Sequence, residues 1–361
     1  MRILAFALMT LALASSVEAQ QARHLYVYNW SDYIDPKLID EFQNETGIKV
    51  VYDTYDSNET LEAKLIAGAS GYDLVFPSAT FLHRQIAAGV LRPLDRTRLK
   101  NAANISKDLD RKLEVYDPGV KHSLVYMWFT TGIAFNEDKI RARLGERAID
   151  TWDIVFSKDS LQKLSDCGVY FLDSPEDVFA IFLHKNKISL DKASPGDIST
   201  AGTQLRAISP FVKKYHSSEY ISALANGDAC LAISWAGDAF QAQARAREAS
   251  NGVRINYVVP KEGSVMSMDV VAMPKDAKNL NEAYEFIDFL LRPDVAARNT
   301  NITKFANGVP GSYQAVSREI AQNPYIFPDD RLMKTLFTIN PLSQIIQRGL
   351  TREWTRVKTR R

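Results

Sequence analysis

Strand-like and helix-like segments alternate through the first part of the chain, and this alternation constrains the fold more than any other feature. β-forming residues fill positions 24–28, 48–55 and 72–76, and a segment with helical spacing of apolar residues follows each of them. The first helix is expected to begin at Asp35-Pro36 and to end at Gly47, because Asp caps helix starts and Gly ends helices. Strands that alternate with helices through short turns form a parallel sheet covered on both faces. The sequence therefore predicts an α/β protein.

The same alternation returns in the second half of the chain. Strand-like residues 168–172, 229–234 and 265–272 each precede a segment with helical spacing. A chain of 361 residues is long enough for two hydrophobic cores. No low-complexity linker separates the two halves, so we expect the chain to cross between two lobes more than once, with residues 264–268 as a candidate hinge.

The first residues have the features of a secretory signal peptide. Arg2 precedes an apolar run at residues 3–14, and Ala19 provides a small residue before a cleavage point at Gln20. The run is too short to span a bilayer, which takes about 20 apolar residues. No cysteine follows it, so no lipid anchor is expected. Residues 1–19 are therefore predicted to be a signal peptide, and the mature protein to diffuse freely in the periplasm.

The balance of charged side chains narrows the classes of partner. The chain has 44 basic and 43 acidic side chains, a net charge of +1, and loss of the signal peptide leaves this balance unchanged. Neither nucleic acid nor an anionic membrane is indicated as a partner, and the basic segment 352–361 is expected to be a solvated end.

Cys167 and Cys230 are the two cysteines. In an oxidising compartment such a pair predicts one disulfide, with two buried free thiols as the alternative.

Four turns at the carboxyl ends of predicted strands carry acids, hydroxyls and aromatic rings. In open α/β sheets this edge is where ligands bind. The turns are residues 30–33, 77–81, 174–177 and 235–238, and no Arg or Lys occurs in them. Asp269 adds a carboxylate within an apolar strand, where it is unfavourable without a cation partner. Together these positions predict a pocket for a cation.

Apart from Asp269, these acids and the two tryptophans also have structural explanations. Asp32, Asp177 and Asp238 lie near predicted helix starts, where an Asp commonly caps the helix, and Trp30 and Trp235 are equally compatible with a core. A ligand site is favoured because four acids occur together. Removal of each ammonium of a small diamine from water costs several kcal/mol, and an aromatic face stabilises it by only about 0.5 to 2 kcal/mol. Carboxylates must therefore hold the charged ends, while rings cover the methylenes.

Sequence motifs for catalysis are weak or missing. The five histidines are scattered without metal-ligand spacing. Ser160 and Lys163 have S-x-x-K spacing but lack the companion motifs of an acylating serine. Neither G-x-G-x-x-G nor the phosphate-binding G-x-x-x-x-G-K-[ST] occurs. We therefore expect a binding protein that uses no cofactor and no metal, rather than an enzyme.

Several long stretches of the chain carry a family resemblance. They include "YNWSDYI", "NETGIKVVYD", "YDLVFPSATFL", "YMWFTTGI", "CGVYFLDSPEDVFA" and "LANGDACLAISWAGD". With these stretches the sequence resembles the periplasmic polyamine-binding proteins of ABC importers, and most closely their putrescine-binding branch. The resemblance implies a two-lobed periplasmic solute-binding fold with a central cleft and crossing hinge strands, which closes over its ligand. Residues 20–132 plus 265–312 would form the first α/β lobe, and residues 133–264 plus 313–361 the second.

The resemblance also implies a set of ligand-binding residues and supports a disulfide between the two cysteines. The implied ligand-binding residues are Trp30, Ser31, Asp32, Tyr33, Ser78, Thr80, Phe81, Asp177, Trp235, Asp238, Ser267, Asp269 and Phe305. Three departures stand out. Asp177 replaces the Glu of the putrescine branch, with Glu176 beside it as a possible substitute. Ser267 stands where relatives have a bulky aromatic residue, and Phe305 stands where the branch has Tyr, so ligand length selection is expected to be relaxed.

The function implied is capture of putrescine or a related polyamine by cleft closure, followed by delivery to an inner-membrane ABC permease and its ATPase. The protein is expected to act as a monomer. Three alternatives remain from the sequence. One is a polyamine sensor that contacts a signalling receptor, and another is a binder of a different small cationic solute. The third is a trap for an amino acid or an anion, which should require an Arg or a helix N-terminus in the cleft.

Overall fold

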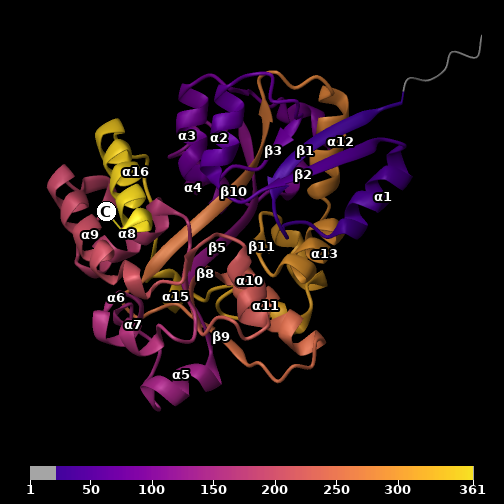
Figure 1. The fold of residues 1–361 in the computed structure, drawn as a ribbon. Coiled ribbons are helices and arrows are strands. Elements are labelled where there is room, and N and C mark those ends of the chain that lie inside the picture. The colour runs from indigo at the N-terminus through magenta and orange to yellow at the C-terminus, as the bar shows by residue number, and fades with distance from the viewer. Residues whose placement is uncertain (1–21, 361) are drawn as a thin grey trace, which may run out of the picture.

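Figure 1 shows the fold in a computed structural model of the chain, which describes residues 22–360. The predicted signal peptide lies outside the described residues. The strands are β1 (His24–Trp30), β2 (Lys49–Tyr55), β3 (Leu74–Val75), β4 (Leu91–Arg92), β5 (Ser123–Asn136), β6 (Val169–Phe171), β7 (Lys214–Tyr215), β8 (Leu231–Trp235), β9 (Ile255–Val258), β10 (Ser264–Pro274), β11 (Ala306–Asn307) and β12 (Leu336–Phe337).

Helices surround these strands in both halves of the molecule (Figure 1). They are α1 (Pro36–Thr46), α2 (Asn58–Ile66), α3 (Ala79–Ala87), α4 (Lys107–Leu113), α5 (Glu137–Leu144), α6 (Asp153–Phe156), α7 (Lys158–Leu164), α8 (Pro175–Lys185), α9 (Pro195–Ile208), α10 (Glu219–Ala225), α11 (Ala236–Glu248), α12 (Leu280–Leu290), α13 (Pro293–Thr303), α14 (Arg318–Ala321), α15 (Asp330–Met333) and α16 (Gln344–Thr359). Within residues 22–360, no helix combines the length and the apolar character that crossing a membrane requires.

Helix α1 shows how local sequence sets the ends of an element. The side chain of Asp35 accepts a hydrogen bond of 3.0 Å from the backbone N–H of Lys37, and Pro36 occupies the first turn. Gly47 ends the helix with a left-handed backbone, at φ 70°. Both helix ends predicted from the sequence are therefore confirmed.

The sheet has the order β2-β1-β3-β10-β5-β8-β6-β7. Its outer groups are parallel, because β1 pairs with β2 and β3, and β6 pairs with β7 and β8. At the centre, β5 runs antiparallel to both β10 and β8. The α/β class is as predicted, but the expectation of a parallel sheet is wrong at the centre. There, two strands carry the chain in opposite directions between the halves of the molecule and lie side by side.

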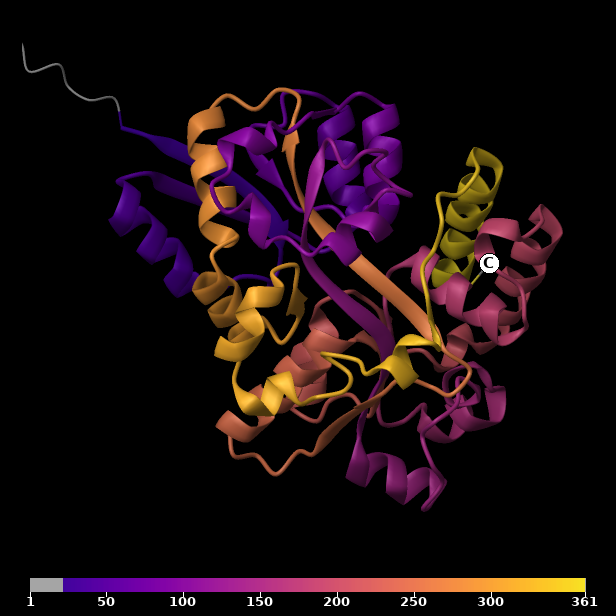
Figure 2. The same ribbon diagram turned by 180° about the vertical axis from the view of Figure 1, so that it is seen from behind.

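Two hydrophobic cores form around this sheet. One core takes its residues mainly from 25–129 and 266–309, and we name its surroundings the first lobe. The other takes its residues from 133–265 and 339–357, and we name its surroundings the second lobe. Strand β5 leaves the first core after Phe129, and β10 enters it at Met266. Figure 2 shows both strands running obliquely from one lobe to the other, so they are the crossing strands.

The second lobe contains the disulfide and the C-terminal helix α16. Cys167 and Cys230 form the predicted disulfide, which joins the segment just before β6 to the residue before β8. The basic C-terminal segment is not a solvated end, contrary to the expectation from its charge. Helix α16 packs against α9 and buries an apolar stripe with buried Glu353 beside it. The stripe consists of Ile346, Leu350, Trp354 and Val357.

Candidate ligand-binding cleft

A cleft lies between the lobes, where β1, β3, β6 and β8 end. It has two adjoining halves that share part of their lining, which we name the near half and the far half. Both halves are lined by Trp30, Asp56, Ser78, Phe129, Ser217 and Trp235. The near half adds Ser31, Tyr33, Tyr55, Ser218, Ile221, Asp238, Asp269 and Phe305. The far half adds Ser57, Asn58, Glu59, Thr80, Phe81, Asp173, Ser174, Pro175, Glu176, Asp177, Ser267 and Ile339.

Two buried carboxylates dominate the near half. Asp238 comes from α11 of the second lobe and is 5% exposed, and Asp269 comes from crossing strand β10 and is 3% exposed. Among residues 22–360, neither carboxylate has a basic side chain in ion-pair contact. Burial raises the pKa of each of them to about 7. Arg245 acts on Asp238 only from beyond ion-pair distance. A cation that entered this half would therefore find two buried carboxylates without an ion-pair partner in the described part of the chain.

Each near-half carboxylate is held by a hydroxyl group. The phenol of buried Tyr220 donates to Asp238, and the hydroxyl of Ser78 donates to Asp269 at 2.6 Å. Helix α11 receives no side-chain capping bond at its N-terminus, so the capping explanation for Asp238 does not apply. These hydroxyl contacts fix the orientation of the carboxylates without neutralising them.

Aromatic rings form the walls of the near half. Trp30 of the first lobe and Trp235 of the second meet edge to face, with ring centroids 5.8 Å apart. On the other side Tyr33 lies 4.8 Å from Phe305, edge to face. Phe129 lies between the two pairs, 5.8 Å from Trp235 and 5.1 Å from Phe305. Such a ring-lined passage suits a chain of methylenes that ends in a cation.

The far half contains a third buried carboxylate. Asp177, at the start of α8, accepts hydrogen bonds from the hydroxyls of Thr131 at 2.8 Å and Ser174 at 2.6 Å. The N-cap residue of α8 is Ser174, so Asp177 does not cap this helix. Burial raises the pKa of Asp177, as it does that of neighbouring Glu176. Glu176 already accepts a hydrogen bond of 2.9 Å from Gln347.

Comparison with known proteins assigns the chain to a family. A model of the family described as bacterial extracellular solute-binding protein matches residues 37–328. The chain is 47% identical to the putrescine-binding periplasmic protein SpuD of Pseudomonas aeruginosa, over 98% of this chain and 97% of that protein. It is 46% identical to the putrescine-binding periplasmic protein PotF of Escherichia coli, over 97% of this chain and 95% of that protein.

The chain belongs to the bacterial extracellular solute-binding protein family.

A solved structure of this family agrees with the assignment. The spermidine/putrescine ABC transporter substrate-binding protein PotD from Streptococcus pneumoniae superposes with a TM-score of 0.74 at 26% identity. The superposition covers 94% of this chain and 99% of that protein. The two-lobed solute-binding fold expected from the sequence is therefore confirmed.

Twelve of the thirteen predicted binding residues of this solute-binding protein line the cleft, and Asp32 is the exception. Its backbone is left-handed, at φ 57°, and its carboxylate forms an ion pair of 2.8 Å with Arg245 of α11. The amide of Gln241 also reaches the backbone oxygen of Asp32, at 3.3 Å. Asp32 therefore joins the two lobes beside the cleft, and its contact with a ligand is a prediction without support from this geometry.

The sequence reasoning missed several residues of the site, and two aromatic residues and two arginines among them shape it most. Tyr55 and Phe129 line the cleft from strands β2 and β5, whose aromatic residues looked like ordinary core. Arg245 and Arg84 bring basic groups to its edge, although the four predicted turns contain none. Arg84 lies about one helical turn after the predicted segment 77–81, and Arg245 lies about two helical turns after the segment 235–238. This helical spacing is the signal that could have indicated both arginines. No cluster of His, Cys, Asp and Glu suited to a metal ion occurs among the described residues.

Proposed function

We propose that this solute-binding protein captures putrescine or a closely related short polyamine in the periplasm. Closure of the two lobes over the ligand is the whole of its mechanism, with no covalent step. The closed complex then delivers its ligand, as a monomer, to an inner-membrane ABC permease and its ATPase. The proposal agrees with the similarity of the chain to SpuD and PotF, which are putrescine-binding proteins.

The observation that carries the proposal is the arrangement of three buried carboxylates around a ring-lined passage. Asp238 and Asp269 occupy one end, and Asp177 occupies the other. An ammonium that leaves water loses several kcal/mol of hydration, which the rings alone cannot replace. Carboxylates at both ends supply that stabilisation to a molecule with a positive charge at each end. A monoamine would leave one end without a cation.

Closure follows from the same arrangement. Asp269 lies on a crossing strand next to Ser78 of the first lobe, whereas Asp238 and Asp177 belong to helices of the second lobe. A diammonium ligand is shared by all of them only when the lobes meet. Since it interacts more strongly with the closed form than with the open form, it shifts the equilibrium toward closure.

Titration calorimetry with putrescine, cadaverine, agmatine and spermidine tests the proposal. Glutamate and succinate serve as probes of the alternative, an amino acid or anion trap. We expect heat of binding and one ligand per protein with at least one short diamine, and none with the two acids. Absence of binding by all four amines, or saturable binding of an acid, would reject the proposed function.

A further inference from the structure

Arg84 of α3 is a fixed cation behind the wall of the far half. Its guanidinium binds the carboxylate of Glu62 through two nitrogens, one of them at 2.6 Å from the oxygen. It also lies 3.7 Å from the centroid of the Phe81 ring, and Phe81 lines the far half. These contacts hold the guanidinium in one place on the first lobe.

From this position Arg84 reaches across the lobes to Glu176. Its Nη1 lies 3.8 Å from the Glu176 Oε1, and the Glu176 side chain is 8% exposed. Glu62 is engaged outside the cleft lining, whereas Glu176 is part of that lining. A single arginine therefore connects a surface carboxylate of the first lobe with a cleft carboxylate of the second.

The other far-half carboxylates divide into paired and unpaired groups. Asp173 pairs with Lys358 at 2.8 Å, and Asp56 lies 3.6 Å from the imidazole of His216. Among the lining carboxylates of the far half that the structure describes, only Asp177 and Glu59 have no ion-pair partner. Of these two, Asp177 is buried and Glu59 is exposed to solvent, so Asp177 alone offers an unpaired buried charge.

We propose that Arg84 limits the length of the ligand by compensating the charge of Glu176, so that the far half accepts the second ammonium of a diamine but not the third of a triamine. This inference rests on the proposed function. The second ammonium meets Asp177. A third ammonium would lie toward Glu176, where it would meet a carboxylate already shared with Arg84 and would be repelled by the guanidinium.

This inference changes one expectation from the sequence. Ser267 in place of an aromatic residue suggested relaxed length selection, because a small side chain opens space in the far half. Space alone does not admit a third ammonium, since its hydration must also be replaced by a carboxylate. Arg84 acts on charge, and Ser267 acts on volume, so the two effects are separable by substitution.

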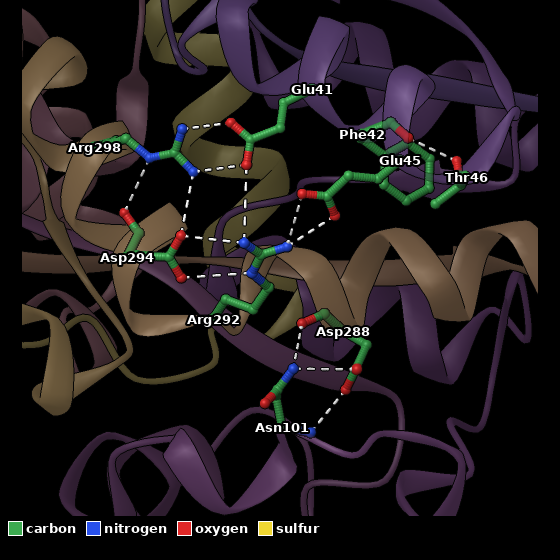
Figure 3. A network of polar contacts seen from close by, with 9 residues as sticks. All are labelled: Glu41, Phe42, Glu45, Thr46, Asn101, Asp288, Arg292, Asp294 and Arg298. Carbon is green, nitrogen blue, oxygen red and sulfur yellow. Dashed lines mark hydrogen bonds and ion pairs between the residues drawn. The ribbon is translucent and has the colours of Figure 1, made fainter.

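Arg84→Met, which keeps an unbranched side chain but removes its charge, is the decisive variant. Arg84→Lys keeps the charge. Arg298→Met is the matched control, because Arg298 binds Glu41 through two nitrogens in the same first lobe, one of them at 2.8 Å, outside the cleft (Figure 3). Glu62→Gln provides a second route, since it removes the negative charge beside Arg84 without altering a lining residue.

The measurement is calorimetric titration of each variant with putrescine and with spermidine at one pH, after circular dichroism has shown that the variant is folded. We expect the spermidine-to-putrescine affinity ratio to rise about tenfold in Arg84→Met, which corresponds to about 1.4 kcal/mol. A smaller change in the opposite direction is expected in Glu62→Gln, because the guanidinium without its Glu62 partner acts more strongly on Glu176 and on a third ammonium. Arg84→Lys and Arg298→Met should keep the ratio of the unaltered protein.

The outcomes separate this inference from the proposed function. If the unaltered protein binds putrescine and Arg84→Met leaves the ratio unchanged, the role of Arg84 is wrong and the proposed function stands. An equal rise in Arg84→Lys would also overturn the role of Arg84, because charge would not be its cause. If the unaltered protein binds neither amine, the proposed function fails, and the inference fails with it.

Discussion

The hydroxyl of Ser78 donates a hydrogen bond of 2.6 Å to the carboxylate of Asp269, and the two residues also meet in an isolated antiparallel bridge. Asn58 supports this contact from α2, because its side-chain amide bonds both the hydroxyl and the backbone N–H of Ser78 at 3.0 Å. The turn after β3 is thus tied to the crossing strand. The carboxylate that would receive a ligand is positioned by two elements at once.

Ligand binding should depend on pH through Asp238 and Asp269. Burial raises their pKa values to about 7, so part of each is protonated near neutral pH. A diammonium ligand requires the ionised forms, so binding releases protons, and putrescine affinity should fall steadily from about pH 8 to about pH 5. Calorimetry in buffers of different ionisation enthalpy measures the released protons. Constant affinity across this range would contradict the role given to the two acids.

The same pKa values determine the direction in which the stability of the protein changes with pH. Both folded-state values are raised above the ordinary 3.8, so the two carboxyls contribute stability below pH 3.8 that is lost as the pH rises through about 7. A bound diammonium ligand offsets this loss because it stabilises the ionised forms. The rise in melting temperature on adding excess putrescine should therefore be larger at about pH 8 than at about pH 5.

Gly237→Ala should prevent full closure. A Cβ at Gly237 of the second lobe would lie 2.3 Å from the Phe305 ring, which belongs to the first core. Separation of the lobes removes this clash, so the substitution penalises only the closed form. We expect putrescine affinity to fall about tenfold or more, equivalent to about 1.4 kcal/mol. Gly349→Ala is the control, because its new Cβ would make only an ordinary contact of 3.5 Å with Ile198.

Scattering curves distinguish this steric effect from general damage. Gly237→Ala should retain the melting temperature of the unliganded protein and should require more putrescine to reach the compact form. A variant that closes at the same putrescine concentration as the unaltered protein would show that Gly237 and Phe305 do not meet on closure.

The ion pair between Asp32 and Arg245 should have a modest effect on affinity. Their side chains are 42% and 37% exposed, so water screens the interaction, and pairs of this kind contribute about 0.2 to 1 kcal/mol. Asp32→Asn and Arg245→Gln should each weaken putrescine binding by less than about fivefold, and the double variant no more than either single one. A loss of about 100-fold in Asp32→Asn alone would instead identify Asp32 as a direct ligand contact.

Glu353 should matter for stability and not for binding. It is fully buried and accepts hydrogen bonds from Arg206 of α9 at 2.6 Å, which attaches α16 to the second lobe, and from Arg356 of its own helix at 2.8 Å. Glu353→Gln should lower the free energy of unfolding by about 2 kcal/mol, since hydrogen bonds to charged groups are weakened. Urea unfolding measures this change. Glu319→Gln, which alters an exposed pair with Arg247, is the control and should have little effect.

Most of the local structure was predictable because it depends on neighbouring residues. Strand, turn and helix followed from hydrophobic spacing and from caps such as Asp35 and Gly47. The pairing of β5 with β10 was not predictable in the same way, because a buried strand gives no sign of the direction of its neighbour. The stripe of α16 was overlooked for a different reason, since its basic residues drew attention to charge.

Much of the site could also be predicted, because parallel strands bring their carboxyl ends to one edge. What the turns could not reveal is which way a side chain points. Asp32 belongs to the first turn, yet its left-handed backbone directs the carboxylate to Arg245. The contact of Arg84 with Glu176 likewise joins residues 92 positions apart and exists only where the lobes meet.

Calorimetric titration of putrescine into the unaltered protein, Asp238→Asn and Asp269→Asn tests the central claim most directly. Asp53→Asn, on the surface of β2 and outside the cleft lining, is the matched control. Because Asp238 and Asp269 have no ion-pair partner within residues 22–360, we expect each of the first two substitutions to weaken putrescine binding about 100-fold. Asp53→Asn should leave the affinity unchanged. Equal affinity in all four proteins would contradict the claim that these two buried acids hold the ligand.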